Sequence, residues 1–153
     1  MRPLLSMMAL SALLAVTGCS SDAPRNSAGA VTASASVDAF SIKVGDCTGK
    51  LTTGTIEGTD LVPCDEKHYY EVFGSTQMTG DTFPGESETS KQAQKFCDAE
   101  FTKFVGIPST KSKYGVFYLT PIADSWKAGD REILCLVGDD NGGIKGTLKG
   151  AKK

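Results

Sequence analysis

The chain has 153 residues, of which 40% are hydrophobic and 22% are charged, a composition typical of one globular domain. Its formal net charge at pH 7 is −2. Nucleic-acid binding requires a basic surface, so this charge argues against nucleic acid as the main partner. Five cysteines but one histidine argue against a zinc cluster or a multi-histidine metal site. We therefore expect neither a metal nor another cofactor.

The first 18 residues have the pattern of an export signal. Arg2 and the amino terminus form a positive start, and residues 4–16 form an apolar run that is too short to cross a bilayer, which takes about 20 helical residues. The run ends in Val-Thr-Gly-Cys at positions 16–19, which resembles the lipobox of bacterial lipoproteins. That resemblance implies that a signal peptide, residues 1–18, is removed. It also implies that Cys19 carries acyl chains such as palmitate and anchors the chain to the extracytoplasmic face of the cell membrane.

A flexible tether is predicted for residues 19–38, starting at the lipidated Cys19. After the cysteine, this segment is rich in Ser and Ala, lacks aromatic residues and shows no sustained apolar period. The folded domain is then expected to cover residues 39–150. On this reading the tether would hold the domain away from the lipid surface.

The clearest predicted element is a helix at residues 88–105. Thr89 and Gln92 form a candidate capping box at its start, and Gly106 supplies a stop at its end. Apolar residues recur at spacings of three and four along one face of this segment: Ala93, Phe96, Cys97, Phe101, Phe104 and Val105.

Strands are predicted on both sides of this helix. The run at residues 132–137 is apolar enough to lie at the centre of a sheet, and Asn141-Gly142 after it is a turn signal. The order strands, helix, strands predicts an α+β fold with a small, mostly antiparallel sheet and the main helix packed on one face. Strands are predicted at residues 40–44, 60–64, 68–78, 114–122, 132–137 and, weakly, 144–148.

Four cysteines remain after Cys19 is assigned to the lipid. Four cysteines allow three pairings, and a small exported domain gains stability from two disulfides. Chain order favours Cys47–Cys64 and Cys97–Cys135. The second pair is also favoured because Cys97 lies on the apolar face of the helix and Cys135 lies among apolar neighbours. The two crossed pairings stay open.

Three motifs resemble the actinobacterial septum-formation family. They are VGDC at positions 44–47, PCDEKHYYEVFG at 63–74, and the spacing W-x-x-G-D-R-x-x-x-C at 126–135. The resemblance covers about residues 40–138. It implies a secreted or membrane-tethered domain associated with division septum formation, and it brings no established chemistry.

The segment around His68 is the first candidate binding site, together with Tyr69 and Glu71. A catalytic Cys–His pair needs a thiolate, and a disulfide at Cys64 would remove the nearest thiol. We therefore expect His68 to have a structural or binding role rather than a catalytic one.

Trp126, Asp130 and Arg131 form the second candidate binding site. An indole beside a guanidinium can stack on a sugar or anchor a protein partner. The alternative is that Trp126 closes one end of the core while Asp130 and Arg131 form a turn.

These features together predict a membrane-anchored lipoprotein whose domain is a non-catalytic binding or scaffolding module of the cell envelope. Its partners would be the membrane, through the lipid, and an envelope protein or a cell-wall polymer. Two alternatives stay open: a wall-active hydrolase that uses carboxylates, and a thiol redox protein that keeps Cys64 or Cys97 as a working thiol. No catalytic residue is assigned.

Overall fold

The computed structural model describes residues 22–52 and 54–153. The predicted signal peptide and Cys19 lie outside the described residues. Within them, no helix is both long and apolar enough to cross a membrane.

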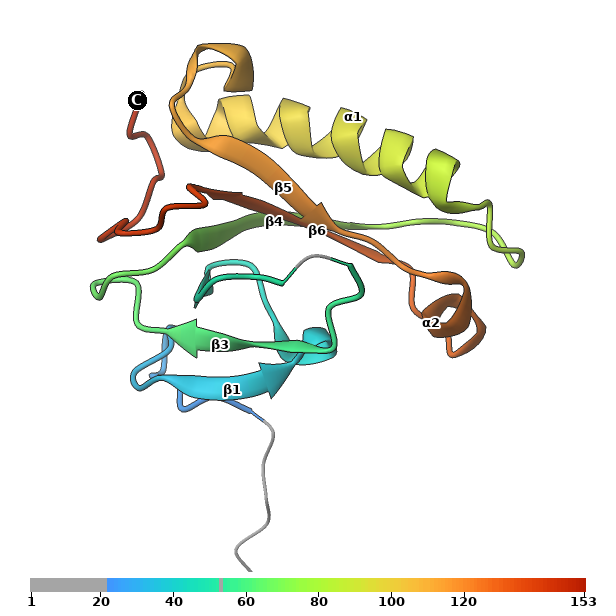
Figure 1. Ribbon diagram of the computed structural model, residues 1–153, viewed down its shortest axis with the longest axis horizontal. Helices are drawn as coiled ribbons and strands as arrows, with labels where there is room; N and C mark the ends of the chain where they lie inside the picture. The colour runs from blue at the N-terminus through green and yellow to red at the C-terminus, as the bar shows by residue number, and fades with distance from the viewer. Residues whose placement is uncertain (1–21, 53) are drawn as a thin grey trace, which may run out of the picture.

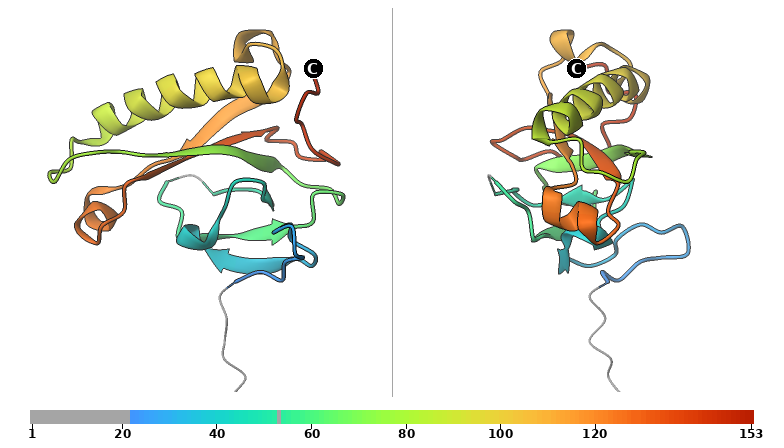
Figure 2. Two further views of the ribbon diagram at one scale, coloured as in Figure 1. Left: turned by 180° about the vertical axis from the view of Figure 1, so that it is seen from behind. Right: turned by 90° about the vertical axis from the view of Figure 1, so that its right-hand side faces the viewer.

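The described residues form three layers (Figures 1 and 2). All strand pairs are antiparallel, and the six strands follow the order β1-β3-β2-β4-β6-β5. The sheet curls, so that β1 and β3 lie across the face of β4 and β6 opposite the long helix α1. This confirms the predicted α+β fold. The strands are β1 (Ala35–Asp38), β2 (Cys47–Thr48), β3 (Gly58–Val62), β4 (Tyr70–Gln77), β5 (Gly115–Leu119) and β6 (Glu132–Gly138), and the α-helices are α1 (Glu86–Val105) and α2 (Ala123–Lys127).

Strand β6 is buried on both faces. Ile133, Cys135 and Val137 belong to the core beneath α1, whereas Leu134 and Leu136 belong to the core shared with β1 and β3. Because side chains alternate along a strand, only a continuous apolar run can serve both cores. The central position predicted for residues 132–137 is confirmed.

Helix α1 packs one apolar stripe on the sheet. Its fully buried residues recur every four positions, at Ala93, Cys97, Phe101 and Val105. The predicted stop is confirmed, because Gly106 adopts a left-handed conformation with φ 88° and donates its N–H to the carbonyl of Thr102.

The predicted capping box of α1 is wrong. The helix begins at Glu86, after Gly85, so Thr89 lies inside its first turn and is buried. Its hydroxyl donates to the carbonyl oxygen of Glu86 at 2.9 Å instead of capping the helix. Glu86 and Glu88 place negative charge in the first turn, where the helix dipole favours it.

Two predicted strands do not form. Residues 39–41 are a 3₁₀ turn because the carboxylate of Asp38 accepts hydrogen bonds from the N–H groups of Phe40 and Ser41. Residues 144–148 make one isolated bridge, His68 with Ile144, and otherwise run as an irregular segment. The carboxylate of Glu71 holds this segment instead.

Residues 22–38 are part of the domain, so the tether predicted for residues 19–38 is corrected over this range. Ala23, Val31 and Val37 are buried in the core on the β1 side, and β1 pairs with β3. The guanidinium of Arg25 binds the buried carboxylate of Asp46 at 2.5 and 2.8 Å. A Ser- and Ala-rich composition concealed this packing because small residues can cover a sheet without a strong apolar period.

One disulfide closes the β2–β3 hairpin, and the other ties α1 to β6. Cys47 of β2 is bonded to Cys64 after β3, and Cys97 of α1 is bonded to Cys135 of β6. The pairing favoured by the sequence is therefore confirmed. Cys47, Cys97 and Cys135 are fully buried.

Removing either disulfide should destabilise the domain, and the loss should be somewhat larger for the disulfide that closes the longer loop. Their sequence separations are 38 and 17 residues, so we expect Cys97→Ala/Cys135→Ala to cost about 4 kcal/mol and Cys47→Ala/Cys64→Ala about 3 kcal/mol. Urea unfolding of the oxidised full chain and the two double variants measures both losses. Equal stability of either variant and the parent chain would contradict this account.

Tyr70 links β4 to the turn after β6. Its ring is buried and lies edge-on to Phe117, with centroids 4.7 Å apart, and its hydroxyl donates to Asp140 Oδ1 at 2.5 Å. Burial, with the hydrogen bond and the charge of Asp140, raises the pKa of Tyr70 to about 12.

This raised pKa predicts a loss of stability at alkaline pH. An unfolded tyrosine titrates near pH 10, so the contribution of Tyr70 is complete below about pH 10 and is lost as pH rises through about 12. Tyr70→Phe should remove this tyrosine-dependent part of the pH profile. The measurement is the free energy of unfolding at several pH values from about 9 to 12, with Tyr118→Phe as the control that keeps the loss. An unchanged profile in Tyr70→Phe would show that other groups cause the alkaline loss.

Candidate functional site

The structure separates the six predicted binding residues into two groups. His68, Tyr69 and Glu71 lie at the start of β4, which pairs with the end of β6 at Gly138. Trp126, Asp130 and Arg131 lie just before β6 begins at Glu132. At about 3.3 Å per residue, the length of β6 keeps the groups about 20 Å apart. They do not form one site.

His68 is a buried residue rather than a surface ligand. It is 1% exposed, and its Nδ1 lies 3.0 Å from the carbonyl oxygen of Glu66. A carbonyl oxygen only accepts, so Nδ1 carries a hydrogen, and Nε2 has no hydrogen-bond partner among the described residues. The neighbouring Cys64 is in a disulfide, so it has no free thiol with which His68 could form a nucleophile pair.

Glu71 and Tyr69 hold the segment that follows β6. The carboxylate of Glu71 accepts hydrogen bonds from the Thr147 hydroxyl and the Leu148 N–H, both at 2.6 Å. The ring of Tyr69 lies so close to Gly142 that a Cβ at that glycine would be 2.8 Å from it. Both side chains therefore have packing and hydrogen-bonding roles within the domain.

Trp126 and Arg131 form a clasp at the other end of β6. Trp126 is 3% exposed, and its indole N–H donates to the carbonyl of Asp81 at 3.1 Å. The guanidinium of Arg131 stacks 3.7 Å from the ring centroid and donates to the carbonyls of Gly80 and Trp126. The clasp fixes the loop between β4 and α1. Trp126 therefore closes one end of the core, as the alternative prediction for this residue proposed.

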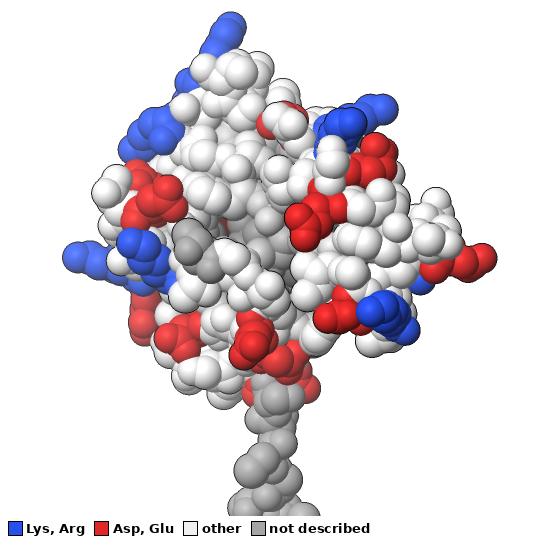
Figure 3. All heavy atoms as spheres, turned by 45° about the vertical axis from the view of Figure 1, so that its right-hand side comes forward, with Lys and Arg blue, Asp and Glu red and all other residues white. Residues whose placement is uncertain are grey.

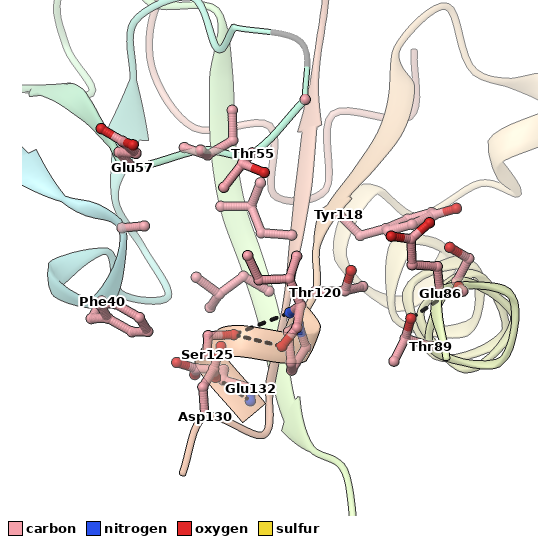
Figure 4. Close-up of a pocket in the computed structure, with 18 residues that line it drawn as sticks. Phe40, Thr55, Glu57, Glu86, Thr89, Tyr118, Thr120, Ser125, Asp130 and Glu132 are labelled. Atoms are coloured by element: carbon pink, nitrogen blue, oxygen red, sulfur yellow. Dashed lines mark hydrogen bonds between the residues drawn. The ribbon is translucent and has the colours of Figure 1, made fainter. Parts of the chain in front are cut away.

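Asp130 alone among the six residues lines the large groove of the domain. This groove has a volume of about 640 Å³ and lies where the end of β5, α2, the start of α1 and residues 54–57 meet (Figure 4). Leu119, Leu134 and Pro121 contribute apolar surface to it, and several hydroxyl groups lie along it. Phe40 and Ile122 line it while remaining 71% and 37% exposed, two of the three large exposed apolar side chains of the described residues.

Four carboxylates line the groove and come from three segments of the chain. Figure 4 shows Glu57 on the side of Phe40, Glu86 on the side of Tyr118, and Asp130 and Glu132 beside α2. No lysine, arginine or histidine is among the described residues that line it. In Figure 3 the hollow is flanked by acidic side chains on both sides, with the basic side chains farther out.

This arrangement suits a partner that presents apolar and positively charged groups. Apolar surface supplies the binding energy, and acidic groups at the rim select positive charge. The described residues contain no group of three or more His, Cys, Asp or Glu side chains placed to hold a metal ion.

Sequence reasoning missed the groove because its lining comes from segments far apart in the chain. Phe40 was assigned to a strand, and Glu86 fell before the expected helix. Asp38 is a local signal for part of this arrangement, because an aspartate at this position can cap a turn at residues 39–41. Such a turn ends β1 and leaves the ring of Phe40 exposed.

Comparison with known proteins identifies the family of the chain. No protein of curated function matches it, and no solved structure matches it. The family model described as septum formation matches residues 14–135, well over half of the chain. The match includes both disulfides, the strand β4 and the Trp126–Arg131 clasp. The chain therefore belongs to the septum-formation family, which indicates a role in septum formation or cell division.

Proposed function

We propose that this chain is a lipid-anchored, extracytoplasmic lipoprotein whose domain is a non-catalytic binding or scaffolding module in septum formation or a related cell-envelope process. The observation that carries the proposal is the acidic, partly apolar groove with Phe40 and Ile122 exposed at its side. An exposed phenyl ring costs free energy in water, so its placement beside a groove favours a partner that covers it.

The proposed partner is an envelope protein that presents a basic and apolar surface. A cell-wall polymer with free amino groups is the other partner that the charge of the groove would accept. Two features support a binding role over a redox role: none of the described residues that line the groove is a cysteine, and Cys64 and Cys97 are each bonded to another cysteine.

The hydrolase alternative is favoured by one observation, the four carboxylates that line the groove. Glycoside hydrolases use two carboxylates on opposite sides of the scissile bond. Digestion of purified cell wall by the full chain distinguishes the two functions. Release of soluble fragments that is lost in both Glu86→Gln and Glu132→Gln would support the hydrolase, whereas no release supports the binding module.

A photo-reactive side chain at position 40 tests the groove in dividing cells. We expect the full-length chain carrying benzoylphenylalanine in place of Phe40 to form one dominant adduct. The same group in place of the exposed Lys145, outside the groove, should not form it. Because rim charge selects the partner, Glu57→Lys should lower the adduct yield about fivefold or more, and Glu57→Gln should lower it less. Equal adducts from positions 40 and 145 would contradict the groove as the binding surface.

Lipid attachment is tested separately at Cys19. Cys19→Ala should abolish labelling by radioactive palmitate and block removal of the signal peptide, because the thiol is the atom that would carry the lipid. The readouts are the labelled band, the mass of the chain and its distribution between membrane and soluble fractions. Ser20→Ala is the matched control and should leave all three unchanged. Labelling that survives in Cys19→Ala would contradict the anchor.

A further inference from the structure

Strand β5 ends the sheet with an unprotected edge. It pairs with β6 on one side, and no hydrogen bond from any other described residue reaches its other side. Edge strands usually carry a charge, a proline or a bulge that prevents pairing with another chain. Residues 115–119 contain neither a charged residue nor a proline, since Pro121 lies two residues beyond the strand, and the register of β5 with β6 is regular from Gly115 to Leu119.

The ladder shows which peptide groups of β5 face outward. The N–H group of Met78 donates to the carbonyl of Arg131, and the N–H group of Asp139 donates to the carbonyl of Tyr69. Arg131 and Asp139 flank β6, so the odd-numbered residues of β6 direct their peptide groups toward β4. Peptide groups alternate along an antiparallel strand, so the even-numbered residues of β6 direct theirs toward β5. Their partners are the odd-numbered residues Gly115, Phe117 and Leu119.

Val116 and Tyr118 therefore direct their N–H and carbonyl groups to the open edge. Their side chains pack partly against the core beneath α1, which fixes the strand in an extended conformation. An extended chain can add to such an edge through main-chain hydrogen bonds alone.

The two ends of β5 carry opposite charges. Lys111 and Lys113 precede the strand, are exposed, and make no ion pair with the described residues. At the other end, residues 118–122 border the groove with Glu86 and Glu132, and neither carboxylate is in an ion pair with a described residue.

We propose that β5 pairs with β5 of a second copy of this chain, antiparallel and across a two-fold axis near Phe117. This pairing joins Val116 of each copy to Tyr118 of the other by hydrogen bonds. It also brings Lys111 and Lys113 of each copy towards Glu86 and Glu132 of the other copy. Because the axis is two-fold, this pairing of opposite charges occurs at both ends of the interface. A different protein would need an uncharged edge strand with lysines before it in order to match this edge. A second copy of this chain already has both features, so it is the partner that fits.

This self-association is distinct from binding of an envelope partner at Phe40. It uses the peptide groups of β5 and the charges at its ends, and the Phe40 side of the groove takes no part in it. Because residues 118–122, Glu86 and Glu132 border the groove and are also used in the self-association, the two proposals are distinguished by adduct formation from position 40 in a chain whose β5 cannot pair.

Val116→Pro and Val116→Ala test the strand pairing as a matched pair. Proline removes an outward N–H that the domain itself does not use, whereas alanine keeps that N–H and removes a similar amount of side chain. Sedimentation equilibrium of the full processed chain in mild detergent should show dimers for the parent and Val116→Ala. The dimer dissociation constant should rise at least about tenfold for Val116→Pro. Near-ultraviolet circular dichroism confirms that both variants are folded.

Exchanging the charges tests the two-fold arrangement. Lys113→Glu and Glu132→Lys should each weaken the dimer severalfold, and the double variant should restore it, because each lysine would again face a carboxylate of the other copy. A parent chain that stays monomeric, a Val116→Pro variant that dimerises like Val116→Ala, or a double variant weaker than both single variants would each overturn the proposal. Adduct formation from position 40 is measured in the Val116→Pro chain as well. An adduct that persists in that chain shows that partner binding at the groove does not depend on pairing of β5.

Discussion

The structure depends on the burial of β6 on both of its faces. Each buried aliphatic side chain contributes about 1.5–3 kcal/mol, but only if something covers it. Helix α1 covers one face, and the curled sheet from β1 to β2 covers the other. The curl, the position of α1 and the core contacts of residues 22–38 and 144–148 all follow from the need to keep water away from a strand with no polar face.

The two layers are secured by different chemistry. On the helix side, a buried disulfide joins Cys97 to Cys135 at the centre of the core. On the other side, the Cys47–Cys64 disulfide closes the β2–β3 hairpin, and the Arg25–Asp46 ion pair holds the N-terminal segment against the loop before β2. Removing Arg25 would leave the carboxylate of Asp46, which is 2% exposed, with only the Lys43 N–H as a donor. A buried charge with one donor is unfavourable, so the ion pair makes residues 22–31 part of the fold.

Strong local patterns in the sequence predicted the central elements correctly. The helix, the strand at residues 132–137 and the Cys97–Cys135 disulfide each had a clear apolar period or apolar neighbours, and chain order favoured Cys47–Cys64. Prediction failed where tertiary contacts decide the conformation. Residues 22–38 have weak local preferences and are held by Arg25 and by pairing with β3, and residues 144–148 are held by one buried carboxylate, Glu71.

The candidate site was predicted less well than the fold, for a related reason. Trp126 and His68 are conspicuous in the sequence because they are rare residues, and both are buried. The groove is instead lined by common residues such as Thr55, Leu119 and Glu132, which are brought together by the pairing of β5 with β6 and by the curl of the sheet. Asp130 is the exception, since it lies in a distinctive motif and also lines the groove.

The packing of the N-terminal segment has a geometric consequence at the bilayer. With Ala23 already buried, a chain anchored at Cys19 has only three intervening residues, a leash of no more than about 14 Å. The layer containing β1 would then lie nearest the phospholipid headgroups, and α1 would face outward.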